Sequence, residues 1–407
     1  HKIYRERLCR GKYRDALRPM VINSWDATEM DFDEQKIIDI AKKGSELGLE
    51  LFVLDDGWFR KRNDDTNSVG DWFADAKKLP NGLGPLAEKI NSFGMKFGLW
   101  FEPEMVSPDS DLYRQHSDWC IFAEERTRTQ NRNTLVLDLS KKEVREYIIN
   151  AIANVLKSAN IEYIKWDCNR NITETANQMQ SHQYVLGLYE ILERLNMMFP
   201  DILFESCSGG GGRFDPGMLY YMPQTWASDN TRPRSRMDIQ YGTSIVYPPV
   251  TMTAHVAKID AHGGKNNPYF NASAMVAMSG SFGFECDLSL IDDEVKQQCI
   301  EYVKLYKKIR ETVQFGDFYR LESPFENGDV SWEFVHGNEV ILFHYQTRFR
   351  ANGEERVIKL KGLEQNAKYM CDGQTYYGEE LMKLGIRIPL ETYDFESGIK
   401  IFYKIEE

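Results

Sequence analysis

The stretch IEYIKWDCNR, residues 161–170, begins as an apolar run and ends in polar side chains. Its first half is typical of a strand that is buried on both faces. Its second half brings an amine, a carboxylate and an amide close together, at Lys165, Asp167 and Asn169. Burial alone does not explain such an end, because unpaired buried charges destabilise a fold. The rest of the chain repeats this arrangement, and the repetition predicts the fold.

Short apolar runs alternate with amphipathic helical patterns over residues 15–313. Strands are expected near residues 20, 52, 98, 136, 164, 204, 226 and 252. Such alternation over about 250 residues predicts an α/β fold, the (β/α)₈ TIM barrel, which the helix expected at 292–313 would close. A doubly wound open sheet is the alternative, and it is less favoured because no glycine-rich nucleotide-binding motif follows any strand.

The two ends of the chain differ in pattern from the barrel region. The start, HKIYRERLCR, is charged and has no apolar signal segment, so we expect residues 1–14 to be a linker or helix continuing from a preceding domain. After residue 313, short alternating strands are separated by Asn-Gly and Gly-Asn turns, which are hairpin signals. Residues 314–407 are therefore predicted to form a small antiparallel β-sandwich domain.

Composition excludes several classes of protein. The 407 residues carry a formal net charge of −12, which disfavours nucleic acid and anionic membranes as partners. The sequence contains no apolar stretch of the roughly 20 residues that a membrane span requires. The seven cysteines form no CxxC pair, so neither a disulfide framework nor a zinc site is indicated. Reduced cysteines predict a cytoplasmic location.

Polar and aromatic residues follow the expected strands, at the end where TIM barrels carry their active sites. They are Trp25, Asp55, Asp56, Trp100, Lys165, Asp167, Asn169, Cys207, Gly209, Trp226 and Asp229, with Arg132 just before another strand. A single aspartate after a strand is more often a helix cap, and a single tryptophan is more often core. Acids at four or more strand ends are harder to explain structurally, because clustered like charges destabilise a fold.

Two chemistries use such a rim. Metal-assisted proton abstraction needs acidic ligands and a lysine base, as in metal-dependent lyases and isomerases. Glycoside hydrolysis needs two carboxylates that flank the scissile bond. The indoles favour a sugar, since its C–H faces pack on aromatic rings. A non-catalytic sugar-binding protein would keep the indoles but would not need both Asp167 and Asp229.

Six motifs make the resemblance to a known family specific. They are INSWDA, FVLDDGWF, FGLWFEPEMV, YIKWDCNR, ESCSGGGGRFD and WASDNTRP. In this order they resemble the barrel motifs of α-galactosidases in glycoside hydrolase family 36, over roughly residues 15–312. The resemblance implies a catalytic barrel with its C-terminal β domain, and an N-terminal β-sandwich domain that is absent from this chain. It also implies that the full-length protein is a homo-oligomer, a tetramer, without metal or other cofactor.

The resemblance further implies an activity and a role for each residue. The expected enzyme releases terminal α-linked galactose from oligosaccharides such as melibiose and raffinose, with retention of configuration. Asp167 matches the nucleophile and Asp229 the general acid/base. Asp55 and Asp56 match the pair that binds the 4- and 6-hydroxyls. The further sugar contacts are Trp25, Trp100, Arg132, Lys165, Asn169 and Trp226, with Cys207 and Gly209 near the 2-hydroxyl.

Related barrels transfer galactose or cleave α-N-acetylgalactosaminides, and both remain alternatives. The wall at Cys207 is expected to leave little room for an acetamido group. For hydrolysis with retention, the two carboxyls are expected about 5–5.5 Å apart. We also expect Lys165 to favour the charged form of Asp167, and burial or a nearby negative charge to keep Asp229 protonated.

Overall fold

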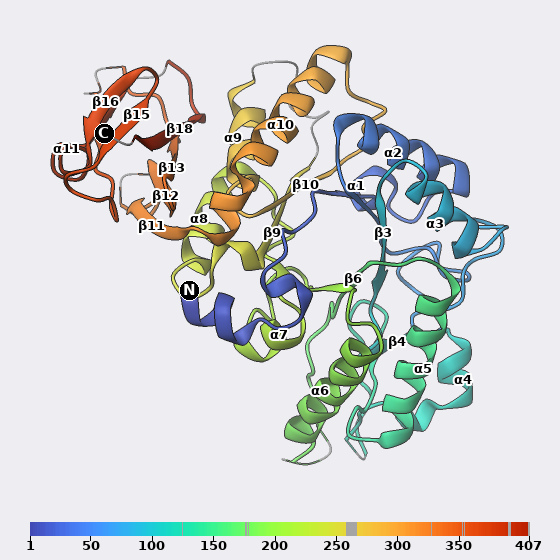
Figure 1. Cartoon of the computed structure of the whole chain (residues 1–407). Coiled ribbons are helices and arrows are strands. Elements are labelled where there is room, and N and C mark those ends of the chain that lie inside the picture. The colour runs from blue at the N-terminus through green and yellow to red at the C-terminus, as the bar shows by residue number, and fades with distance from the viewer. Residues whose placement is uncertain are drawn as a thin grey trace.

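A closed barrel of eight parallel strands forms the centre of the molecule (Figure 1). The computed structural model describes residues 1–123, 125–175, 177, 179–257, 267–326, 328–351, 353, 355–389 and 392–405. Around the barrel the order is β1-β10-β9-β8-β7-β6-β3-β2. The strands are β1 (Val21–Asn23), β2 (Leu51–Leu54), β3 (Lys96–Phe101), β6 (Tyr163–Trp166), β7 (Leu203–Ser206), β8 (Gln224–Trp226), β9 (Met252–Ala257) and β10 (Ser281–Glu285). The predicted TIM barrel is confirmed.

One predicted barrel strand is wrong and another was missed. The run near residue 136 forms β5 (Leu135–Val136), which pairs with β4 (Met105–Val106) outside the barrel. The eighth barrel strand is instead β10, which pairs with β9 and β1. Its sequence, SFGFE, contains Ser281 and Gly283 and lacks a continuous apolar run.

Gly283 is small for a steric reason. A Cβ at this position would lie 2.7 Å from His255 Cδ2 and 2.7 Å from the carbonyl oxygen of Val21. The strands on both sides of β10 therefore approach too closely for any side chain. Gly283 interrupts the apolar pattern by which this strand would have been recognised, and its small size allows the barrel to close here.

Helices surround the barrel (Figure 1). They are α1 (Trp25–Thr28), α2 (Glu34–Leu47), α3 (Leu83–Asn91), α4 (Asp111–Gln115), α5 (Lys142–Ser158), α6 (Gln180–Met198), α7 (Pro216–Tyr221), α8 (Pro233–Thr243), α9 (Pro268–Ala277) and α10 (Asp293–Phe315). The longer amphipathic helices, such as α2, α5 and α10, each bury an apolar face. Several begin at a side-chain cap: Asp33 accepts from the Lys36 N–H at 2.8 Å, and Asp292 accepts from the Val295 N–H at 2.8 Å. No helix in the described part of the chain is both long and apolar enough to cross a membrane.

The C-terminal domain follows α10 and packs against it and α9. Its six-stranded antiparallel sheet consists of β11 (Asp317–Glu322), β12 (Val330–His336), β13 (Glu339–Gln346), β18 (Glu396–Ile405), β15 (Lys368–Cys371) and β16 (Gln374–Tyr377). A two-stranded sheet, β14 (Arg356–Ile358) with β17 (Ile386–Ile388), lies over it, and α11 (Gly378–Lys383) completes the domain. Residues of both sheets share one apolar core, as predicted for a small sandwich.

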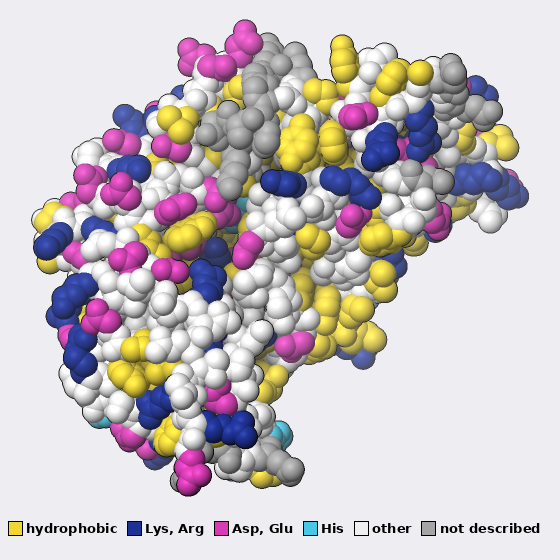
Figure 2. Space-filling view, turned by 180° about the vertical axis from the view of Figure 1, so that it is seen from behind, with side chains coloured by type: hydrophobic (Ala, Val, Ile, Leu, Met, Phe, Trp, Pro, Cys, Tyr) yellow, Lys and Arg dark blue, Asp and Glu magenta, His cyan; other side chains and the backbone are white. Residues whose placement is uncertain are grey.

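Acidic and basic side chains are interspersed on the face shown in Figure 2, and hydrophobic side chains gather along one of its edges. Short helical turns at Tyr4–Leu8 and Lys12–Arg14 lead into the barrel. The ring of Tyr13 joins an inner apolar cluster with Val21, Leu51 and Tyr163. The first residues of the chain thus contribute to the barrel interior.

Candidate active site

One pocket opens at the carboxyl ends of the barrel strands. Its lining residues are Trp25, Asp26, Asp55, Asp56, Trp100, Arg132, Lys165, Asp167, Asn169, Cys207, Trp226, Asp229, Thr231 and Glu285. The cavity volume is about 120 Å³, which is small beside the roughly 300–1,000 Å³ typical of pockets for drug-sized ligands. The space suits one sugar ring. Asp167 and Asp229, which lie on different strand ends, face this same cavity.

Gly209 is the one predicted site residue outside this lining. It lines a neighbouring cavity, together with Asn169. Its backbone N–H donates to Asn169 Oδ1 at 3.2 Å, so Gly209 contacts a residue of the site lining without lining the pocket itself. Gly209 and Gly210 have φ values of 52° and 89°, a left-handed conformation that favours glycine. The glycine run therefore shapes a turn behind Asn169.

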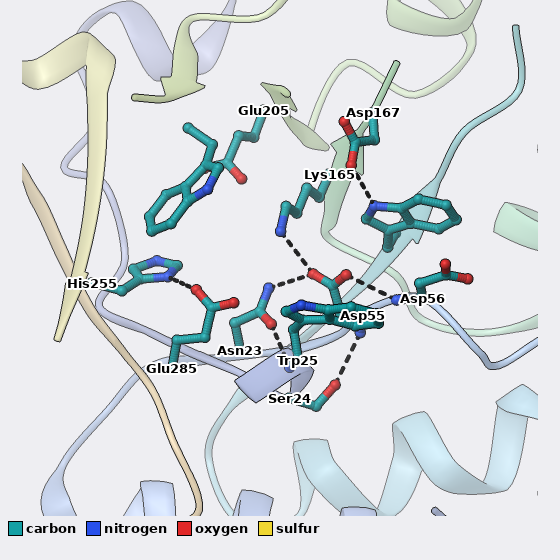
Figure 3. A network of polar contacts seen from close by, with 12 residues as sticks. Asn23, Ser24, Trp25, Asp55, Asp56, Lys165, Asp167, Glu205, His255 and Glu285 are labelled. Atoms are coloured by element: carbon teal, nitrogen blue, oxygen red, sulfur yellow. Dashed lines mark hydrogen bonds and ion pairs between the residues drawn. The ribbon is translucent and has the colours of Figure 1, made fainter. Parts of the chain in front are cut away.

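The base of the pocket is a buried polar network around Asp55 (Figure 3). Lys165 Nζ donates to Asp55 Oδ2 at 2.8 Å, and Asn23 Nδ2 donates to the same oxygen at 2.7 Å. The Asp56 N–H donates to Asp55 Oδ1 at 2.9 Å. Although burial opposes the charge of Lys165, Asp55 and the nearby carboxylates raise its pKa well above the usual value. Lys165 is therefore a cation within the described network.

Lys165, which was expected to act on Asp167, forms its ion pair with Asp55. Asp167 instead accepts hydrogen bonds from Trp100 Nε1 at 3.1 Å and from Asn169 Nδ2 at 2.7 Å, both at Oδ2. Its other oxygen accepts from the Cys168 N–H at 2.8 Å. Three donors therefore hold this one carboxyl group from both of its oxygens. Asp167 is thus held in place by neutral donors, while Lys165 bonds Asp55.

Of the two alternatives expected for Asp229, burial and a nearby negative charge, the structure shows the second and not the first. Its side chain is exposed rather than buried, on the loop that follows β8. Trp226 Nε1 donates to Asp229 Oδ1 at 2.8 Å. The nearby negative charge is present, because Asp229 is one of the charges that raise the pKa of Glu285. The two aspartates therefore occupy different environments, one surrounded by donors and buried, the other at the pocket mouth.

Asp56 is held by Arg62, an arginine that no sequence motif marked. Arg62 Nε donates to Asp56 Oδ1 at 3.0 Å, and Arg62 Nη2 donates to Oδ2 at 2.8 Å. Both side chains are buried. Burial nevertheless raises the pKa of Asp56 despite the guanidinium. The two-point contact fixes the plane of the carboxylate that faces the pocket.

Glu102 is a buried carboxyl group directly behind the nucleophile candidate. Its Oε1 accepts the Asn169 N–H at 2.6 Å. Burial, and secondarily the charge of Asp167, raises its pKa to about 8. A protonated Glu102 avoids a second negative charge beside Asp167 while still holding the backbone of Asn169.

Three lining residues were not among the predicted sugar contacts: Asp26, Thr231 and Glu285. Glu285 ends β10, the strand that was missed, so its position at the rim was not recognised. Burial raises its pKa to about 7. Its Oε2 lies 3.1 Å from His255 Nδ1, and burial lowers the pKa of His255 to about 3, so the imidazole is neutral. Among the described residues, no group of three or more His, Cys, Asp or Glu side chains has the arrangement to hold a metal ion.

Comparisons with known proteins identify two families of domain. A family model described as Melibiase matches residues 1–316, and one described as Glycosyl hydrolase family 36 C-terminal domain matches residues 329–402. Alpha-galactosidase AgaA of Geobacillus stearothermophilus is 50% identical over 408 residues, which cover 98% of this chain and 56% of that protein. Alpha-galactosidase Mel36A of Lactobacillus acidophilus is 44% identical over 418 residues, covering 100% of this chain and 57% of that protein.

Solved structures agree with these matches. The crystal structure of the GH36 alpha-galactosidase AgaA superposes with a TM-score of 0.96 at 48% identity, covering 100% of this chain and 58% of that one. A variant of the same enzyme in complex with raffinose also has a TM-score of 0.96, with the same coverage. The chain spans a little more than half the length of these relatives.

Proposed function

Because the chain belongs to the melibiase family, with the C-terminal domain of glycoside hydrolase family 36, we propose that it is the catalytic part of a retaining α-galactosidase. The observation that carries the proposal is that Asp167 and Asp229 line one pocket of sugar size. The site offers one carboxylate surrounded by donors and one carboxyl group at the mouth. That is the pair which glycoside hydrolysis requires.

In the first step, the Asp167 carboxylate attacks the anomeric carbon of the bound galactoside and forms a β-linked galactosyl ester. The bond between that carbon and the leaving oxygen breaks at the same time. Asp229, in its acid form, gives its proton to the leaving oxygen. The donors from Trp100, Asn169 and the Cys168 N–H hold the Asp167 carboxylate in place for the attack.

In the second step, Asp229 in its carboxylate form takes a proton from water, whose oxygen attacks the anomeric carbon. The ester bond to Asp167 breaks and α-galactose is released, so two inversions give net retention. Proton transfer of this kind contributes about 10²–10⁴-fold to a rate. The exposed position of Asp229 gives water access to it after the leaving group departs.

The other lining residues are proposed to recognise galactose. Asp55 and Asp56 accept hydroxyl hydrogens, and Lys165 and Arg62 hold these two carboxylates in position. Trp25 offers an apolar face beside them. Arg132 reaches the same pocket from the loop before β5. A neutral sugar suits this part of the site, because the charges of Asp55 and Asp56 are already paired with Lys165 and Arg62.

The proposed substrates are oligosaccharides with terminal α-linked galactose, such as melibiose and raffinose. A relative has been crystallised with raffinose and another variant of it with stachyose. Cys207 lies buried in the pocket wall, which argues against an acetamido group if the 2-position faces it. Transfer of galactose to a second sugar would use the same ester intermediate with a different acceptor.

The full-length protein is proposed to be a cytoplasmic homo-oligomer, a tetramer. All seven cysteines are free and buried, in keeping with a reducing compartment. Ile3, Ile245 and Val246 are exposed large apolar residues. The segments that carry them lie together, since His1 bonds the Ser244 carbonyl and Tyr4 packs on Tyr247. Exposed apolar surface of this kind is typical of an interface, and sedimentation of the longer protein tests the assembly.

The decisive test is hydrolysis of p-nitrophenyl α-galactoside by this chain, with the product anomer followed by proton NMR. The proposal predicts release of α-galactose first, and the β-anomer only by mutarotation. Initial release of the β-anomer would refute the retaining mechanism. If this chain binds 1-deoxygalactonojirimycin in calorimetry but shows no turnover, the catalytic proposal for this chain fails while galactose recognition stands.

A further inference from the structure

Each of the two aspartates accepts a hydrogen bond from a different buried indole. Trp100 donates to Asp167 Oδ2 at 3.1 Å, and Trp226 donates to Asp229 Oδ1 at 2.8 Å. Both indoles are almost fully buried, at 2% and 3% exposure. Their N–H groups, which would otherwise meet sugar hydroxyls, are thus already used by the carboxylates. The two indoles therefore do more than contact the sugar, because each one also bonds an aspartate.

The ring of Trp226 is fixed from more than one side. The His255 ring centroid lies 4.7 Å from that of Trp226, and His255 is in turn bonded to Glu285. The Arg236 guanidinium lies 4.5 Å from the indole centroid. Arg236 is buried, and none of its guanidinium nitrogens has a hydrogen-bond partner. Attraction to the indole face is therefore a major stabilising contact for this cation.

Asp229 depends on this indole more than Asp167 depends on Trp100. Within the described part of the chain, the bond from Trp226 is the only hydrogen bond to the Asp229 carboxyl group. Asp167 has two further donors, the Asn169 amide and the Cys168 N–H. Because Asp229 is exposed on a loop, the buried indole is the group that holds its carboxyl group by a hydrogen bond.

An indole N–H donates and does not accept. Oδ1 of Asp229 is therefore the acceptor, and because a carboxyl carbonyl oxygen accepts better than the hydroxyl oxygen, the bond favours the proton of the acid form on Oδ2. We propose that Trp226, supported by Arg236, is a positioning residue that orients Asp229 and assigns its transferable proton to Oδ2. This inference rests on the proposed function and adds a specific role to it.

If Trp226 positions Asp229, the effect of losing this contact depends on the leaving group of the substrate. When the C–O bond breaks, the proton moves from Asp229 Oδ2 to the leaving oxygen, while Asp167 forms the ester. A p-nitrophenolate departs with little help from a proton, whereas a sugar alkoxide needs it. Misplacing Asp229 therefore harms melibiose cleavage more than cleavage of the nitrophenyl substrate. Misplacing Asp167 harms both, because every substrate meets the nucleophile.

The test compares Trp226→Phe with Trp100→Phe, two changes that keep a ring and remove an N–H. For each variant, kcat/KM is measured on p-nitrophenyl α-galactoside and on melibiose. Trp226→Phe should lower the value for melibiose about 10-fold more than for the nitrophenyl substrate, a modest part of what acid catalysis contributes. Trp100→Phe should lower both values by the same factor.

Arg236→Met provides a second variant, because methionine keeps much of the side-chain volume and the arginine nitrogens have no hydrogen-bond partner that the change would leave unpaired. It should shift the ratio of the two kcat/KM values in the same direction as Trp226→Phe, by a smaller factor. Equal losses on both substrates for Trp226→Phe, or an unchanged ratio for Arg236→Met if Trp226→Phe does not fold, would overturn the inference. A wild-type chain that cleaves neither substrate would instead overturn the proposed function.

Discussion

Replacing Lys165 by methionine isolates the buried ion pair at the base of the pocket. Lys165 and Asp55 have side-chain exposures of only 8% and 5%, and their charged atoms lie 2.8 Å apart. Methionine fills similar space without a charge. Asp55 would keep the donors from Asn23 and the Asp56 N–H but lose its counter-charge. Glu205 and Glu285, whose charges also act on Lys165, would lose the same cation.

Removing one partner of a buried ion pair typically costs about 3–5 kcal/mol, because the other charge is left uncompensated. Unfolding entropy is roughly 2.1 cal/mol/K per residue, so for a barrel of about 300 residues this cost lowers Tm by about 5–8 °C. Differential scanning calorimetry at neutral pH measures the shift. The matched control is Lys165→Met with Asp55→Asn, which removes both charges and should recover at least half of the loss. A single variant that melts within about 2 °C of wild type, or a double variant no better than the single one, would refute the reasoning.

Three further predictions concern other parts of the structure. The pKa of Glu102, about 8 in the folded protein, means that its stabilising contribution is full below about pH 4.5 and is lost as pH rises toward 8. The wild type should therefore lose about 1.4 kcal/mol per pH unit relative to Glu102→Gln in chemical denaturation, and parallel stability curves would contradict this. Gly283→Ala should destabilise by about 1–3 kcal/mol through the clash with His255, whereas Gly242→Ala, where a Cβ meets nothing within 4 Å, should not destabilise; equal melting temperatures for the two would contradict the steric argument. Arg62→Lys should raise KM for p-nitrophenyl α-galactoside while leaving kcat within about threefold, because a lysine keeps the charge but not the two-point contact with Asp56; an unchanged KM would contradict that role.

The sequence predicted the barrel where strands are continuous apolar runs, as in β2 and β6. The prediction failed for β5, whose apolar run resembles a barrel strand but which pairs with a strand outside the barrel. TLVLDLS has the composition of a barrel strand, yet β5 pairs with β4, and periodicity does not identify a pairing partner. It failed again at β10, where Gly283 and Ser281 interrupt the apolar run because the neighbouring strands approach closely.

The sequence located the residues of the candidate site but not the contacts between them. Most of the residues named at the strand ends line one pocket, because all parallel strands of a barrel end at one rim. Their partners were not predicted, because contacts between strands join residues far apart in the chain. Lys165 pairs with Asp55, 110 positions away, rather than with its near neighbour Asp167. Glu285 was missed together with its strand, and Arg62 has no sequence pattern that marks it.

Azide rescue of the two aspartate variants tests the division of labour between Asp167 and Asp229 most directly. Asp167→Ala should lose turnover of p-nitrophenyl α-galactoside, and added azide should partly restore it by attacking from the vacated face to give β-galactosyl azide. Asp229→Ala, with its nucleophile intact, should give α-galactosyl azide through the ester. The product configurations are read by NMR. Wild-type turnover by Asp167→Ala, or α-galactosyl azide from it, would contradict the assignment of Asp167 as the nucleophile.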